Sequence, residues 1–166
     1  ALHKLPVRIL ASGGGMIYAP LGPTHTSIED FSLMQSIPGI KIFSPADSVE
    51  MRSLLIETME DPEPLYIRFG KGGEPIVTSE DSGSIYSPKI FGDRGSDFLV
   101  CTTGVVLQEA LKAREILNAQ GFALEIWHFP FLGGTSSPLV LDQYKNYKHI
   151  LVVEEHIPTG GLFTNL

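Results

Sequence analysis

Residues 22–34 of the chain read GPTHTSIEDFSLM, and this stretch joins a rigid turn to the beginning of a helix. Pro23 fixes one backbone dihedral of the turn, and Thr26 or Ser27 can cap the helix that follows. Apolar residues then recur at helical spacing, which predicts a helix over residues 27–37. The segment is therefore a strand-to-helix loop whose tip carries a histidine.

The same alternation continues along the chain on both sides of this loop. Apolar runs predict strands at residues 7–11, 40–43, 65–68, 98–102, 123–127 and 150–154, and helical spacing predicts helices at 48–59, 105–118 and 139–147. Strands that alternate with helices form parallel sheets joined by right-handed crossovers. We therefore expect an α/β fold made of two α/β blocks, each with a mostly parallel sheet.

The alternation fails between the two blocks. Residues 70–97 contain the breaker-rich pieces GKGG, SGS and GDRG, with only short extended stretches between them. We expect a first domain at residues 1–70, a linker at 71–97 and a second domain at 98–166. The first block offers about three strands, which is a thin sheet to stand alone.

Composition restricts the class of protein. The chain has 166 residues, a hydrophobic fraction of 43% and a formal net charge of -7, which argues against nucleic acid or an anionic membrane as a partner. No apolar run approaches the roughly 18 residues that cross a bilayer, and no export signal is visible. The single cysteine, Cys101, excludes an internal disulfide framework and reads as a buried, unreactive thiol. We expect a cytoplasmic protein.

The histidine at the loop tip is the first candidate for chemistry. An imidazole titrates near neutral pH, so His25 can donate or accept a proton for a small polar substrate. The alternative is that this segment is an ordinary turn ahead of a capped helix, because short motifs often occur by chance.

Other polar residues carry weaker signals. The four remaining histidines have neither the spacing nor the cysteine partners of a metal site: His3, His128, His149 and His156. Glu154 and Glu155 follow a strand, where paired acids are usually solvated. The glycines at 13–15 lack the lysine and hydroxyl residue of a phosphate loop. Gly160 and Gly161 could hold an anion on backbone amides, or could serve close packing.

Several stretches together resemble the thiamine-diphosphate-dependent transketolase family. In family order they are residues 22–25 (GPTH), 42–47 (IFSPAD), 65–68 (LYIR), 100–104 (VCTTG) and 152–156 (VVEEH), the last leading to the glycines at 160 and 161. The resemblance runs over nearly the whole chain. It implies that the chain holds the second half of a pyrimidine-binding domain, followed by most of a transketolase C-terminal domain.

The resemblance also implies an activity. Enzymes of this family use thiamine diphosphate and Mg²⁺ to transfer a two-carbon ketol unit from a ketose donor to an aldose acceptor, and their substrates are sugars or sugar phosphates. The family's activating glutamate, its stacking aromatic residue and the diphosphate and Mg²⁺ site lie outside this segment. We therefore expect this chain alone to be inactive, and to work as a homodimer or with a split-subunit partner that carries the diphosphate-binding domain.

The resemblance assigns roles to two side chains. His25 matches the family histidine that faces the donor's hydroxyl and carbonyl oxygens, so it is expected to be both catalytic and substrate-binding. Arg68 matches a strand-end arginine that contacts a distal phosphate or carboxylate. The alternative for Arg68 is a structural ion pair with Glu29 or Asp30. Leu21 stands where many transketolases have an aspartate, which favours a less hydroxylated or unusual ketose.

Two other functions remain open from the sequence. One is a component similar to the β subunit of a 2-oxo-acid dehydrogenase, although the GPTH run favours the transketolase type. The other is a non-catalytic assembly module on the same scaffold.

Overall fold

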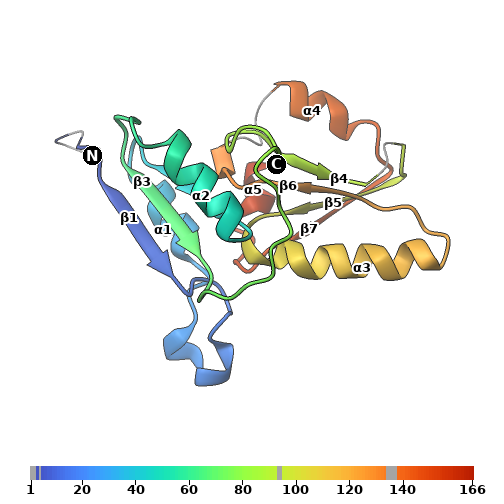
Figure 1. Ribbon diagram of the computed structural model, residues 1–166, viewed down its shortest axis with the longest axis horizontal. Coiled ribbons are helices and arrows are strands. Elements are labelled where there is room, and N and C mark those ends of the chain that lie inside the picture. Colours follow the sequence, from blue (N-terminus) through green and yellow to red (C-terminus); the bar gives the residue numbers. More distant parts are fainter. Residues whose placement is uncertain (1–2, 4, 93–94, 134–137) are drawn as a thin grey trace.

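The computed structural model describes residues 3, 5–92, 95–133 and 138–166, and it contains two sheets that lie side by side (Figure 1). The first sheet has the order β1-β3-β2, and all of its strands are parallel: β1 (Arg8–Ser12), β2 (Lys41–Phe43) and β3 (Leu65–Phe69). The central strand β3 is buried on both faces, as expected for a parallel strand with helices on both sides.

Two helices cover opposite faces of the first sheet. Helix α1 (Asp30–Gln35) places Phe31 against Ile42 and Tyr66, whereas α2 (Ser48–Glu57) places Leu54 against the face that contains Leu65 and Ile67. The strand's alternation of faces thus separates two apolar clusters. Asp47 caps α2 as the sequence predicts, since its carboxylate accepts hydrogen bonds from the amides of residues 49 and 50.

The second sheet has the order β4-β6-β5-β7. Its strands are β4 (Lys89–Phe91), β5 (Phe98–Thr102), β6 (Glu125–His128) and β7 (His149–Val153), and only β4 runs antiparallel to its neighbour. Helix α3 (Leu107–Ala119) packs on one face of this sheet. Helices α4 (Pro138–Tyr144) and α5 (Leu162–Asn165) pack on the other, around Trp127. These two mixed α/β blocks confirm the predicted fold class.

The expected linker contributes to the second sheet. β4 lies inside residues 71–97 and pairs with β6, so this segment is not a simple connector. Nearby, the amides of Val77 and Thr78 bind the Asp47 carboxylate, each at 2.7 Å, and the Ile85 side chain is fully buried in the first domain's core. The segment therefore packs against both blocks, and the domain limits given above remain a prediction.

Helix α1 begins later than the sequence suggests. The predicted helix begins at Ser27, but in the structure Ser27 exchanges two backbone hydrogen bonds with Gly15, at 2.8 and 2.9 Å. That pairing holds Ser27 in a bridge, so the first helical residue is Asp30 and neither Thr26 nor Ser27 acts as its cap. The prediction of a capped helix at this point was wrong in its start and its cap.

The two sheets meet at the carboxyl ends of their strands. Just past β2, the Ser44 amide donates to the Pro130 carbonyl at 2.7 Å, and the Gly104 amide donates to the Ser44 carbonyl at 3.0 Å. A Cβ at Gly104 would lie 2.4 Å from the Ser44 hydroxyl oxygen, so this close approach requires glycine. In α/β sheets, ligands bind at this edge.

Candidate functional site

The segment that carries His25 is a loop at the carboxyl end of β1. It contains two short 3₁₀ turns, η1 (Ala19–Leu21) and η2 (Pro23–His25), and Figure 1 shows it extending beyond the ends of β1 and β3. The bridge between Gly15 and Ser27 closes the loop at its base. The loop is therefore a defined structure held at one end, and its tip is free to face another molecule.

The imidazole of His25 is exposed at this tip. The His25 amide donates to the Gly22 carbonyl at 3.0 Å, which fixes the turn, and Gly22 adopts a φ of 91° that favours glycine. The ring's Nδ1 lies 3.0 Å from the Thr24 hydroxyl oxygen. With Nδ1 engaged in this way, Nε2 is the nitrogen that can exchange a hydrogen bond or a proton with a ligand.

Arg68 lies on β3, near the base of the loop, and is only 6% exposed. Its Nη1 donates to Asp30 Oδ1 at 3.1 Å, and its Nη2 donates to the Glu155 carbonyl at 2.9 Å. The guanidinium carbon also lies 4.5 Å from the centroid of the Phe31 ring. The structure thus contains the ion pair with Asp30 that the sequence offered as an alternative, and the proposed contact with substrate stays a prediction.

Asp30 is a shared acceptor in a buried network. Its second oxygen, Oδ2, accepts a hydrogen bond from the Tyr66 hydroxyl at 2.7 Å. Burial raises the pKa of Tyr66, and the hydrogen bond to Asp30 raises this pKa further. Sequence reasoning missed Tyr66, although residues 66 and 68 share one face of their strand and Asp30 lies in the first turn of the adjacent helix.

The second domain completes this network through His156. The His156 ring stacks on Phe31 with centroids 5.0 Å apart, and its Nδ1 lies 2.7 Å from the Ile157 carbonyl oxygen. The buried Nε2 lies 3.9 Å from Asp30 Oδ1, which is too long for a hydrogen bond. His156 therefore packs the second domain against the ion pair between Asp30 and Arg68.

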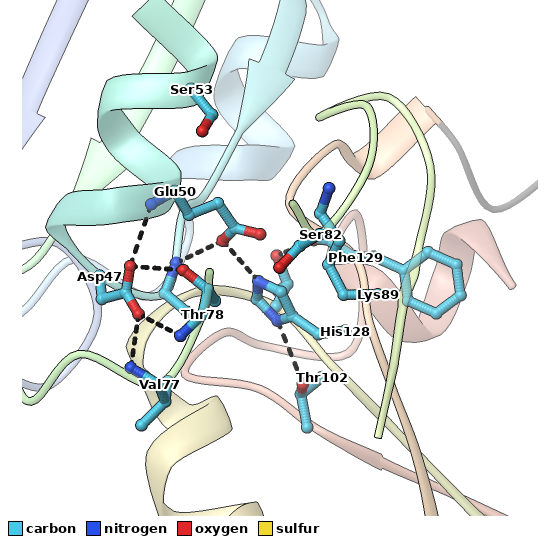
Figure 2. Close-up of polar contacts among 12 residues, drawn as sticks. Asp47, Glu50, Ser53, Val77, Thr78, Ser82, Lys89, Thr102, His128 and Phe129 are labelled. Atoms are coloured by element: carbon cyan, nitrogen blue, oxygen red, sulfur yellow. Dashed lines mark hydrogen bonds and ion pairs between the residues drawn. The ribbon is translucent and has the colours of Figure 1, made fainter. Parts of the chain in front are cut away.

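A second polar cluster joins the domains farther along the interface (Figure 2). The buried carboxylate of Glu50, on α2, accepts the Ala46 amide at 2.7 Å and lies 2.9 Å from His128 Nε2. The other ring nitrogen of His128 is 3.3 Å from the Thr102 hydroxyl oxygen. His128 is fully buried between the domains, so it is a structural contact between α2 and the second sheet.

The weaker sequence candidates have structural roles. The Glu154 carboxylate accepts hydrogen bonds from the amides of Leu162 and Phe163, at 2.6 and 3.0 Å, and so holds the beginning of α5. Gly160 packs against α1, where an added Cβ would lie 2.4 Å from the Ser32 hydroxyl oxygen. Burial raises the pKa of the Cys101 thiol to about 12, as expected for an unreactive cysteine.

The described part of the chain lacks two kinds of feature. No group of three or more His, Cys, Asp or Glu side chains there is placed to hold a metal ion. No helix in the same residues combines the length and the hydropathy that a membrane span requires.

Family comparisons divide the chain into two recognised domains. Residues 1–74 match the transketolase pyrimidine-binding domain, and residues 91–166 match the transketolase C-terminal domain. The two matches cover both sheets described above.

Individual relatives agree with these matches. A 1-deoxy-D-xylulose-5-phosphate synthase of Syntrophotalea carbinolica is 30% identical over 164 residues, which cover 97% of this chain and 26% of that protein. A subunit of the apulose-4-phosphate transketolase of Phocaeicola vulgatus is 28% identical, over 94% of this chain and 50% of that protein.

A solved structure described as a split-gene transketolase, inactive β4 tetramer, is also similar. It superposes with a TM-score of 0.84 at 28% identity, over 99% of this chain and 53% of that one. The chain thus spans between about a quarter and a half of the length of these proteins.

Proposed function

Because the chain belongs to the transketolase family, we propose that it is a component of a thiamine-diphosphate-dependent enzyme that transfers a two-carbon ketol unit from a ketose donor to an aldose acceptor. The observation that carries this proposal is the exposed His25 imidazole. It lies on a closed loop at the carboxyl end of the first sheet, the edge at which α/β sheets bind ligands.

His25 is proposed to act on the donor substrate. From Nε2 the imidazole can donate a hydrogen bond to a hydroxyl or carbonyl oxygen, and it can pass a proton because the ordinary pKa of a histidine lies near neutrality. The neighbouring Thr24 hydroxyl holds the other nitrogen, which fixes the orientation of the ring. Catalysis by proton transfer requires this kind of positioning.

Thiamine diphosphate, when bound, supplies the electron sink that stabilises a carbanion. Among the described residues, His25 suits one side of such a site, but no carboxylate cluster suits Mg²⁺. We therefore propose that the ligands of the metal and the diphosphate come from a diphosphate-binding domain outside this chain. This chain would supply the loop that faces the substrate.

A partner polypeptide or domain follows from this division. The relatives include one subunit of a two-part transketolase and a split-gene transketolase whose β4 tetramer is described as inactive. We propose that this chain works in a homodimer or with a separate subunit, that it is inactive alone, and that the assembly is cytoplasmic. The single buried cysteine fits a reducing compartment.

The donor is proposed to be a ketose with fewer hydroxyl groups near the loop, or an unusual one. Leu21 is 61% exposed in the turn that precedes His25, so it presents apolar surface where an acidic residue would read a hydroxyl. The relatives named for apulose 4-phosphate and 1-deoxyxylulose 5-phosphate support a substrate outside the common pentose phosphates.

The test is an assay of the full-length protein with its partner, thiamine diphosphate and Mg²⁺. A panel of ketose phosphates and 2-oxo acids serves as donors, with an aldose acceptor. We expect turnover with one or more ketoses and only with both components present. Turnover confined to 2-oxo acids would indicate a dehydrogenase-type component, and no turnover with any donor would favour a non-catalytic module.

A further inference from the structure

We propose that Arg68 is a positioning residue that fixes the His25 loop from beneath, through Asp30 and the second domain, rather than a ligand of the substrate. This inference rests on the proposed role of His25. It concerns the same site but assigns a different task to Arg68 from the one that the family resemblance suggests.

The guanidinium of Arg68 is already occupied. Nη1 binds Asp30, and Nη2 binds the Glu155 carbonyl and lies 3.7 Å from the Glu155 carboxylate. One face of the group is covered by Phe31. An incoming phosphate or carboxylate would have to displace Asp30 or Glu155, and separating a buried ion pair is strongly unfavourable.

Arg68 also supports the base of the loop by direct contact. A Cβ built on Gly14 would lie 2.7 Å from Cγ and Cδ of Arg68, and one built on Gly15 would lie 2.2 Å from its Nη2. The loop backbone at these two glycines therefore rests on the arginine side chain. Gly15 is the residue that pairs with Ser27 to close the loop.

Both ends of the loop thus depend on one side chain. Arg68 contacts the backbone at Gly14 and Gly15, where the loop begins, and binds Asp30, where the loop has passed into α1. The second domain adds to this arrangement, since the Ile157 amide donates to the Ile28 carbonyl at 2.9 Å. In this way the packing of the second domain sets the position of the loop.

The consequence for chemistry is positional. Within the described residues, the hydrogen bonds of His25 at the exposed tip are all local, so the base of the loop determines where its ring lies. A displacement of about 1 Å can lower a rate by about a hundredfold even when the mutated residue is far from the reaction. Loss of Arg68 should therefore lower kcat without selecting among substrates.

The experiment compares variants of the full-length enzyme with its partner. Arg68→Lys keeps the charge and loses the two-pronged geometry, Asp30→Asn weakens the ion pair, and Gly14→Ala disturbs the contact without changing a charge. Arg52→Met, at an exposed arginine on α2, is the control. Hydrogen exchange of residues 15–27 is measured for each, together with kcat and KM for a phosphorylated and an unphosphorylated acceptor.

We expect faster exchange in residues 15–27 for the three test variants, and a fall in kcat of roughly tenfold to a hundredfold that is similar for both acceptors. The control should match the parent protein. Unchanged exchange in both Arg68→Lys and Asp30→Asn, or a rise in KM confined to the phosphorylated acceptor, would overturn the inference.

The exchange measurement does not depend on activity. If His25→Ala retained full turnover, the proposed function of His25 would fail, while the exchange comparison would still decide whether Arg68 positions the loop. If Arg68→Lys failed to fold, Asp30→Asn and Gly14→Ala would decide by the same two measurements.

Discussion

Replacement of Glu50 by alanine should strongly destabilise the contact between the two domains (Figure 2). The variant removes the acceptor of two buried hydrogen bonds, from the Ala46 amide and from His128. A hydrogen bond to a charged group contributes about 1.5–3 kcal/mol, but Glu50 Oε1 is buried with no hydrogen-bond partner among the described residues, which offsets part of the gain. We therefore expect the free energy of unfolding to fall by about 3–5 kcal/mol, as is typical when one partner of a buried pair is removed.

Urea-induced unfolding of the full-length protein, followed by circular dichroism, measures this loss. Glu109→Ala is the matched control, because the Glu109 carboxylate pairs with Lys112 at the surface, where the two side chains are 67% and 63% exposed. The control should change stability by less than about 0.5 kcal/mol. A loss below about 1 kcal/mol for Glu50→Ala would refute the argument that this carboxylate holds the interface.

Two further predictions concern titratable groups. Burial alone would raise the pKa of Asp61, but hydrogen bonds from Lys41, the Glu63 amide and Tyr86 lower this pKa from 3.8 to about 2. The unfolded chain therefore binds the proton first as pH falls, so Asp61 stabilises the fold above about pH 4, and this stability is lost between about pH 4 and pH 2. Asp61→Asn should flatten this part of the stability profile in acid titration, and an unaltered profile would contradict the assignment. Because burial raises the pKa of the Cys101 thiol to about 12, iodoacetamide at about pH 8 should label it only after denaturation; rapid labelling of the native protein would be inconsistent with this burial.

The sequence predicts the regular elements well where apolar periodicity is long. The strands around β3 and β5 and the helix α3 follow directly from buried apolar runs and helical spacing. β4 was not predicted as a sheet strand because it has only three residues among turn-forming ones. The beginning of α1 was wrong because the pairing of Ser27 with Gly15 is a tertiary contact that overrides local helical spacing.

The polar networks were harder to predict for the same reason. Glu50 and His128 are 78 residues apart, and nothing in the local pattern of either indicates that they meet. The ion pair of Arg68 with Asp30 was one of two alternatives, and only the packing of α1 against β3 distinguishes it from a free guanidinium. By contrast, the exposed turn at His25 follows from local residues alone, because Pro23 and Gly22 determine its backbone.

The most direct measurement of the central claim compares His25→Ala with the parent enzyme, as the complete assembly. The claim is that this imidazole acts on the donor while the cofactor is held by other groups. We expect turnover of the ketose donor to fall by about a hundredfold or more, as is typical for a lost proton-transfer group, with binding of thiamine diphosphate nearly unchanged by calorimetry. Normal turnover, or a loss of cofactor affinity that accounts for the whole effect, would contradict the claim.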